Sequence, residues 1–208
     1  MKSLEELKSE IIEYGRLAGL KNFTPGYSGN ISARYEDKIL ITASGTANGY
    51  LKDDDLVVMD FGGNLIEGDK KPSSEKMLHV QFYRQREDVN YIIHVHPPFL
   101  SAFACAHAAL DEPLMAENVF YFGQIPLADY GLPGSMELVE KTAKYFDKYN
   151  AVLMANHGFV VGDSTILDAF LKLELAESYA QVVCNTKILG GAVPLSEKQV
   201  DEIYSLKN

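Results

Sequence analysis

Two histidines stand one residue apart at the end of an apolar segment, in the sequence YIIHVHPPFL. In a β-strand, residues i and i+2 lie on the same face, so His94 and His96 would present their imidazoles to the same side. Two neutral imidazoles in that position can bind one divalent metal ion, and imidazole suits zinc. Alone, a His-x-His pair is a weak signal, because most histidines are structural or exposed.

A third histidine, His157, stands in the segment ANHG between two strand-like segments. Gly158 permits an unusual backbone angle there, so a simple turn with an incidental histidine would also explain the segment. A catalytic zinc site, however, typically has three protein ligands and one open position for water or substrate. If the strands lie close together, His94, His96 and His157 would supply those three ligands.

Three further segments carry polar residues that could hold a phosphate or a proton. In KPSSE, Ser73 and Ser74 precede an expected helix, where they would either cap the helix or receive a phosphate together with its free N–H groups. Glu75 would either favour the helix dipole or act as a base beside the metal. GYSGNIS (26–32) and TASGT (42–46) offer hydroxyl and N–H groups in turns, which could form an anion site.

The composition of the chain narrows the setting of such a site. Its 208 residues, 47% of them hydrophobic, are enough for one sizeable domain with a core. The net charge of −10 argues against nucleic acid or an anionic membrane surface as a partner, and a phosphorylated ligand would need local positive potential. Cys105 and Cys184 form neither a disulfide framework nor a zinc motif. With no signal-peptide pattern and no apolar run of about 18 residues, we predict a cytoplasmic globular protein.

The elements that must position these residues follow from hydrophobic periodicity and turn signals. We expect one layered α/β or α+β domain in which helices cover a sheet. The expected helices cover residues 3–19, 72–87, 98–107, 135–149 and 165–189, with a short one from Ser196. The expected strands cover residues 30–34, 38–42, 56–60 and 91–95, a segment near Ile125, and the pair 151–155 and 159–162.

The order and spacing of GYSGNIS, TASGT, KPSSE, HVHPP and ANHG resemble the class II aldolase/adducin family, and in particular its sugar-phosphate aldolases. The resemblance covers nearly the whole chain. It implies a single domain over residues 1–208, with a three-layer α/β/α architecture and a largely antiparallel central sheet. It also implies a homotetramer whose active sites lie at subunit interfaces.

By position, the resemblance assigns a role to each polar segment. His94, His96 and His157 correspond to the ligands of one Zn²⁺ per chain. Glu75 corresponds to the catalytic carboxylate, which also approaches the zinc when substrate is absent. The phosphate-binding positions correspond to Asn30, Ser44, Gly45, Ser73 and Ser74, and Gly29 is expected to shape the same loop.

At some tyrosine positions the chain differs from the family, and at others it aligns with the family only loosely. Tyr27 stands where the family's fuculose-phosphate enzyme has threonine, which changes the phosphate contacts expected there. The family's aldolases also use a tyrosine from a neighbouring subunit, and Tyr121 in ENVFYFGQ is the candidate for that catalytic role. Tyr204 in the C-terminal tail is a candidate for closing the site.

The two remaining histidines fall outside these roles. His79 lies four residues after Glu75 on the same helical face, so it could contact the residues that hold the Glu75 carboxylate. We interpret it as a structural histidine instead, and His107, near the end of its helix, in the same way.

The activity that the resemblance implies is zinc-dependent, reversible cleavage of a ketose 1-phosphate, such as fuculose or ribulose 1-phosphate, into dihydroxyacetone phosphate and an aldehyde. Zinc would polarise the C2 carbonyl, and Glu75 would exchange the proton at C3. A methylthioribulose-1-phosphate dehydratase, which also carries Glu at this position, is an alternative. A pentulose-5-phosphate 4-epimerase would carry Asp there. A non-catalytic adducin-like interaction module would need neither the three histidines nor Glu75.

Overall fold

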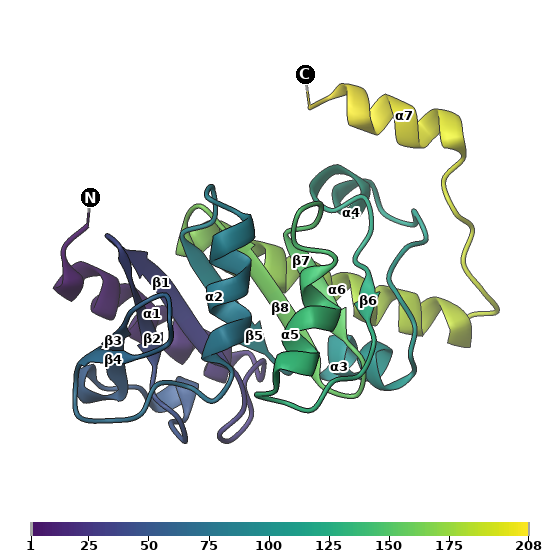
Figure 1. The fold of residues 1–208 in the computed structure, drawn as a ribbon. Helices are drawn as coiled ribbons and strands as arrows, with labels where there is room; N and C mark the ends of the chain where they lie inside the picture. The colour runs from purple at the N-terminus through teal and green to yellow at the C-terminus, as the bar shows by residue number, and fades with distance from the viewer. Residues whose placement is uncertain (1, 208) are drawn as a thin grey trace.

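An eight-stranded sheet in the order β4-β3-β2-β1-β5-β8-β7-β6 runs through the middle of the structure (Figure 1). The structure is a computed structural model that describes residues 2–207. Neighbouring strands are antiparallel except β6 and β7, which are parallel, so the largely antiparallel sheet is confirmed. The strands are β1 (Asn30–Tyr35), β2 (Lys38–Thr42), β3 (Leu56–Met59), β4 (Leu65–Glu67), β5 (Tyr91–Val95), β6 (Leu127–Ala128), β7 (Ala151–Met154) and β8 (Gly158–Asp163).

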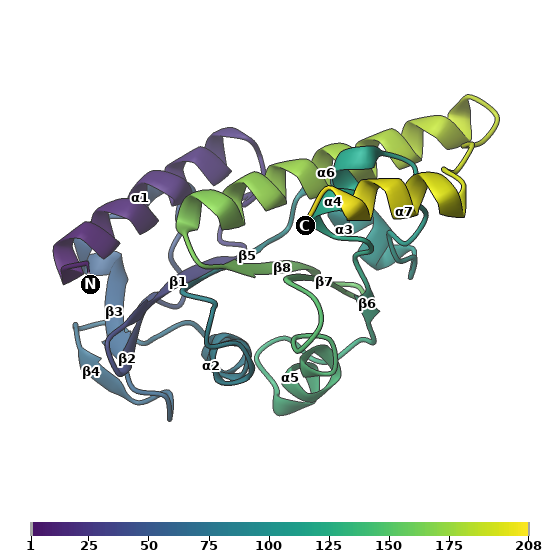
Figure 2. The same ribbon diagram turned by 90° about the horizontal axis from the view of Figure 1, so that it is seen from above.

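Helices cover both faces of this sheet. Figure 2 shows α1, α3, α4, α6 and α7 on one side and α2 and α5 on the other, which confirms the three-layer α/β/α architecture. The helices are α1 (Leu4–Leu20), α2 (Lys76–Gln85), α3 (Pro98–Cys105), α4 (Ala116–Tyr121), α5 (Met136–Ala143), α6 (Ile166–Ile188) and α7 (Glu197–Ser205), with short 3-10 turns at Asn48–Tyr50 and Asp53–Asp55. Within residues 2–207, no helix is both long and apolar enough to cross a membrane.

Alternation along the strands divides the core into two apolar clusters, one on each face. On β1, Ile31 and Ala33 pack in the cluster under α1 and α6. The intervening Asn30 and Ser32 therefore face α2, and both are buried polar residues. The same alternation on β5 sends His94 to the α2 face, so the polar residues of two neighbouring strands gather on one side of the sheet.

Helices α1 and α6 begin where the capping signals indicate, whereas α2 begins only at Lys76, after Glu75, and has no side-chain cap. Ser3 accepts a hydrogen bond from the backbone of Glu6 in a capping box, and Thr165 caps α6 in a similar way. The helix expected over residues 135–149 is shorter, because the N–H groups of Tyr145 and Phe146 bond to carbonyls three residues back and form turns. The exposed strand β4 and the short helix α4 were not predicted.

Candidate metal and substrate site

The candidate residues meet at one edge of the sheet, where several elements begin or end. Asn30, the first residue of β1, pairs in register with His94 near the end of β5. β8 lies on the other side of β5 and starts at Gly158, directly after His157. Glu75 stands at the N-terminus of α2, which packs over these strand ends. The sheet thus brings together residues that lie far apart in the sequence.

The three histidines predicted as metal ligands form one cluster. One ligand atom from each of His94, His96 and His157 lies within 4.8 Å of the others. The Nε2 atoms of His94 and His96 are 3.1 Å apart. Among the described residues, this is the cluster whose donor atoms could hold one metal ion.

A neighbouring strand fixes the orientation of His94. Its Nδ1 lies 2.9 Å from the carbonyl oxygen of Phe159 on β8. Because a carbonyl oxygen can only accept, Nδ1 carries the proton, and the lone pair of a neutral ring lies on Nε2. A metal-bound imidazole is normally held through its second nitrogen in this way. Nε2 of His94 therefore points into the histidine cluster, where it would offer its lone pair to a metal ion or, when protonated, donate to Glu75.

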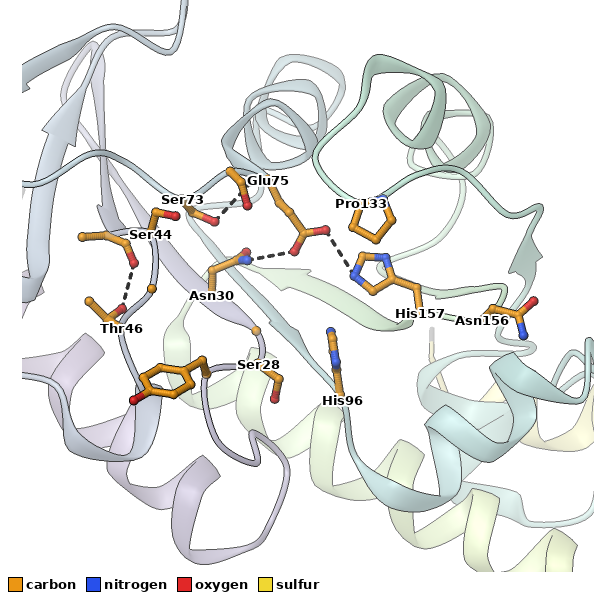
Figure 3. A pocket seen from close by; sticks show the side chains of 15 residues that line it. Ser28, Asn30, Ser44, Thr46, Ser73, Glu75, His96, Pro133, Asn156 and His157 are labelled. Carbon is orange, nitrogen blue, oxygen red and sulfur yellow. Dashed lines mark hydrogen bonds and ion pairs between the residues drawn. The ribbon is translucent and has the colours of Figure 1, made fainter.

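Glu75 completes the donor set (Figure 3). Its Oε2 lies 3.0 Å from Nε2 of His94. Its Oε1 lies 3.2 Å from Nε2 of His157, the contact that Figure 3 shows. Burial would raise the pKa of this carboxylate, but the charges and hydrogen bonds of His94 and His157 lower the pKa of Glu75 far below its ordinary value of 4.5. Glu75 is therefore ionised at neutral pH.

The donor atoms fit a divalent metal ion. Burial, together with the neighbouring His94 and His157, lowers the pKa of His96 to about 3, so the ring is neutral at physiological pH and could offer a lone pair to a metal ion. Oε1 of Glu75 is buried, and its close neighbour is Nε2 of His157 at 3.2 Å, so a metal bound by that nitrogen would leave Oε1 available to the metal or a substrate. Three imidazoles with a nearby carboxylate match a catalytic metal site with an exchangeable position.

A cleft of about 430 Å³ opens beside this cluster. It contains all six predicted phosphate-site residues along with Glu75, His96 and His157, whereas His94 lies behind it with no exposed surface. The lining residues are Tyr27, Ser28, Gly29, Asn30, Ala43, Ser44, Gly45, Thr46, Ser73, Ser74, Glu75, His96, Pro133, Asn156 and His157. In the part of the chain that the structure describes, no lysine or arginine lines it, so hydroxyl and N–H groups would have to hold an anion.

The family model for the class II aldolase and adducin N-terminal domain matches residues 9–184, a span that contains the whole cleft. The chain belongs to the class II aldolase and adducin family. The resemblance drawn from the five sequence segments is therefore confirmed.

Relatives within the family carry several enzyme names. An L-fuculose phosphate aldolase from Methanocaldococcus jannaschii is 37% identical over 84% of this chain and 94% of its own. A 5-deoxy-D-ribulose 1-phosphate aldolase from Bacillus thuringiensis is 32% identical, covering 96% of this chain and 94% of its own. A 3-oxo-tetronate 4-phosphate decarboxylase from Haemophilus influenzae is 34% identical over 84% of this chain and 85% of its own. A solved L-fuculose 1-phosphate aldolase superposes with a TM-score of 0.91 at 32% identity, covering 99% of this chain and 97% of that one.

In this class II aldolase-family chain, Glu177 supports the segment that follows His96. Pro97 and Pro98 have no N–H groups, so the first donors of α3 are Phe99 and Leu100. Their N–H groups donate to the two carboxylate oxygens of Glu177 on α6, over 2.9 and 2.8 Å. The sequence does not predict this contact, since a glutamate on a long helix gives no sign that it is buried.

Asn48 was also missed, and it shapes the loop before β1. Its Nδ2 donates to Thr24 Oγ1 over 3.2 Å and to the carbonyl oxygen of Ser28 over 2.9 Å. Gly29 follows with a φ of +78°, and a Cβ atom there would lie 2.4 Å from the carbonyl oxygen of His94. Only glycine allows the loop to lie this close to the end of β5.

The two candidate tyrosines lie outside the cleft of their own chain. Tyr121 on α4 is 55% exposed and lines a separate depression with Lys172 and Leu171 of α6. Tyr204 on α7 lies beside Gly123, next to α4. Within one chain, therefore, neither hydroxyl reaches the histidine cluster, and the expected tyrosine would have to come from a neighbouring copy.

Proposed function

We propose that this chain catalyses the zinc-dependent, reversible cleavage of a ketose 1-phosphate into dihydroxyacetone phosphate and an aldehyde. The observation that carries the proposal is the meeting of His94, His96 and His157 with Glu75 at the inner end of one polar cleft. A zinc ion held by the three imidazoles would supply Lewis-acid polarisation of the substrate's carbonyl and hydroxyl oxygens. The aldolase names of the relatives support the same reaction class.

Glu75 is the proposed proton carrier for C3 of the three-carbon fragment. Its Oε2 already accepts a hydrogen bond from Nδ2 of Asn30 over 3.0 Å. Oε1 has no amide donor and lies 3.2 Å from Nε2 of His157, a nitrogen that would bind the metal, so Oε1 is the oxygen that we assign to proton transfer. In synthesis, Oε1 would remove the C3 proton, and in cleavage the protonated carboxyl would return it.

The loops around the cleft are the proposed phosphate site. Ser73 accepts a hydrogen bond from the backbone N–H of Glu75 over 3.3 Å, which leaves its own hydroxyl proton free to donate to a ligand (Figure 3). Ser74, Ser44 and Gly45 line the same end of the cleft. A phosphate bound there would orient the carbon chain towards Glu75. Asn30 donates one of its two amide hydrogens to Glu75, so the second is left to donate to the phosphate.

Decarboxylation of a 3-oxo acid phosphate is the second candidate, because the Haemophilus influenzae relative carries that name. Loss of carbon dioxide leaves negative charge beside a carbonyl, as loss of an aldehyde does, so the same metal and phosphate positions would serve both reactions. Dehydration of methylthioribulose 1-phosphate and epimerisation of a pentulose 5-phosphate start from the same kind of site. Glu75 favours the aldolase over the epimerase.

Proton exchange at C3 of dihydroxyacetone phosphate in heavy water, followed by NMR, tests the proposal without knowledge of the aldehyde. We expect stereospecific exchange with zinc-loaded protein, no exchange after chelation, and a loss of about 10²- to 10⁴-fold in Glu75→Gln, the usual contribution of a general base. The Gln variant should retain zinc through its three histidines. Zinc-loaded protein that exchanges no C3 proton would contradict the aldolase and favour the decarboxylase or dehydratase.

We also propose a homotetramer in which a neighbouring chain supplies Tyr121. Leu171 on α6 is half exposed and lines the same depression as this tyrosine, which supports a contact between copies. Mixing inactive Glu75→Gln and Tyr121→Phe subunits would regenerate some sites that contain both native residues. Recovery of activity on mixing is the expected result. No recovery, despite exchange of subunits shown by mass spectrometry, would rule Tyr121 out.

The proposed compartment is the cytoplasm. Cys105 and Cys184 are both free thiols, which supports a reducing environment. Fractionation of the source cells with an antibody to the chain would test it, and recovery outside the cytoplasm would contradict it.

A further inference from the structure

A continuous row of buried polar side chains leads away from Glu75 into the protein. Asn30 bridges Glu75 and His79: its Nδ2 lies 3.0 Å from Oε2 of Glu75, and its Oδ1 lies 2.5 Å from Nε2 of His79. Nδ1 of His79 lies 2.7 Å from the hydroxyl of Ser32, which lies 2.8 Å from the hydroxyl of Tyr83. All five residues are buried, and His79 and Ser32 have no exposed surface. We call these five residues the polar row.

The polar row arises from the match between a helix and a strand. Glu75, His79 and Tyr83 stand four residues apart, so they share one face of α2 and recur about every 6 Å. Asn30 and Ser32 stand two residues apart on β1, so they share one face and recur about every 6.7 Å. The nearly equal spacings let the strand residues alternate with the helix residues, and each polar atom finds a partner.

The partners fix the direction of each hydrogen bond. Oε2 of the ionised Glu75 can only accept, so the NH₂ of Asn30 faces it and the amide oxygen faces His79. That oxygen needs a donor, so His79 carries its proton on Nε2. Nδ1 of His79 then accepts from Ser32, whose oxygen can accept from Tyr83. The donors of Ser32, His79 and Asn30 therefore all point towards Glu75.

The protonation state of His79 agrees with this direction of the hydrogen bonds. Burial, together with the neighbouring His94, lowers the pKa of His79 to about 3, so the ring is neutral at physiological pH. A neutral ring has one N–H and one lone pair, and the row uses both. His79 thus has a single tautomer that satisfies both Asn30 and Ser32.

We propose that His79 is a positioning residue for Glu75, acting through Asn30. Its N–H holds the Asn30 amide in the orientation that places NH₂ against Oε2, and this leaves Oε1, which lies 3.2 Å from Nε2 of His157, as the oxygen without an amide donor. The inference rests on the proposed function, in which Oε1 carries the C3 proton. Without the N–H of His79, the oxygen of the Asn30 amide loses its partner, and the amide is held by the carboxylate alone. The amide can then move away from Oε2, and Glu75 loses the donor that fixes its working position.

A pair of substitutions separates this role from simple packing. His79→Leu fills a similar volume between α2 and β1 but has no N–H, whereas His79→Gln has an amide N–H that can reach the oxygen of Asn30. We expect His79→Leu to lower kcat for C3 exchange by about 10- to 100-fold, as is typical when a hydrogen-bond partner of a site ligand is lost. KM should change little, and His79→Gln should restore most of the lost kcat. Equal kcat in wild type and His79→Leu would overturn the proposal, as would equal losses in both variants.

A second measurement needs neither a variant nor a metal. Long-range ¹H–¹⁵N NMR of the metal-free wild-type chain reports the tautomer of His79. We expect the proton on Nε2, and a proton on Nδ1 would overturn the proposal even if His79→Leu does not fold. If the tautomer is as expected but the wild-type zinc protein exchanges no C3 proton, the proposed function fails and the orientation of Asn30 by His79 stands.

Discussion

Gly158 and His96 lie in direct contact: a Cβ atom at Gly158 would lie 2.6 Å from Cδ2 of the imidazole and 2.7 Å from the carbonyl oxygen of Val95. The first residue of β8 must therefore lack a side chain for His96 to lie where it does. Gly158 therefore contributes to the histidine cluster in two ways: it permits the turn, and its missing side chain leaves room for the His96 ring.

Gly158→Ala should displace His96 and weaken metal binding, since interpenetrating atoms force either the ring or the strand to move. We expect a loss of metal affinity of about 10-fold or more, comparable with the loss of a group that orients a ligand. Gly162→Ala is the matched control, because it lies on the same strand and its Cβ would instead press on Val89 and Phe82 in the core. Competition with a zinc-binding dye measures both. Equal affinities in the two variants would contradict the assignment.

Metal content tests the histidine cluster directly. Purified protein should contain about one zinc per chain, the stoichiometry of a mononuclear site. The double variant His94→Ala, His96→Ala should contain none, and His107→Ala, whose ring lies beside Asn156, should retain it. Elemental analysis after dialysis against zinc gives the numbers. If the double variant still contained about one zinc per chain, the metal site would have to lie elsewhere.

Asn48→Ala should impair substrate binding without touching the metal. It removes two buried hydrogen bonds that hold the loop before Gly29, which should lower the free energy of unfolding by about 1–3 kcal/mol. With the loop loosened, KM for the phosphorylated substrate should rise while zinc content stays the same. Asn64→Ala, which removes a bond to Asp60 in an exposed turn, is the control. An unchanged KM in Asn48→Ala would separate this loop from phosphate binding.

Glu177 should make stability depend on pH. Burial raises the pKa of Glu177 above its ordinary value of 4.5, although the N–H groups of Phe99 and Leu100 oppose this. The folded chain therefore holds this proton more tightly than the unfolded chain. The resulting stabilisation is complete below 4.5 and is lost as pH rises through the raised pKa.

Urea unfolding of the metal-free chain and of Glu177→Gln, between about pH 4 and pH 7, measures this contribution. The free energy of unfolding of wild type minus that of the variant should fall as pH rises. A difference that stays constant, or one that grows with pH, would show that the pKa is not raised. Because Gln cannot titrate, processes common to both proteins cancel in the difference.

The parts of the site that sequence could predict are those set by local periodicity. The i, i+2 relation on one strand was enough to place His94 and His96 side by side. His157 joins them only because β5 pairs with β8, and periodicity says nothing about which strands pair. That prediction came from the resemblance to the family.

Other parts had no local signal at all. Asn48 and Glu177 bond to backbone groups 20 and 78 residues away, so their partners exist only in the folded chain. The predicted helix over residues 135–149 is longer than α5, because the apolar pattern continues to Phe146. Phe146 is buried although it lies in a turn. His79 was interpreted as structural since the residues it contacts, Asn30 and Ser32, lie on a different element.

The absence of lysine and arginine from the described lining of the cleft has a consequence for how substrate arrives. The chain carries a net charge of −10, so a phosphate dianion approaches against the protein's long-range field. Dissolved salt screens that repulsion over about 10 Å at 0.1 M. Encounter should accordingly quicken as ionic strength rises from low values, whereas enzymes that draw anions in with cationic side chains slow down. Selection of a phosphorylated ligand then depends on short-range contacts made after arrival, not on electrostatic capture from a distance.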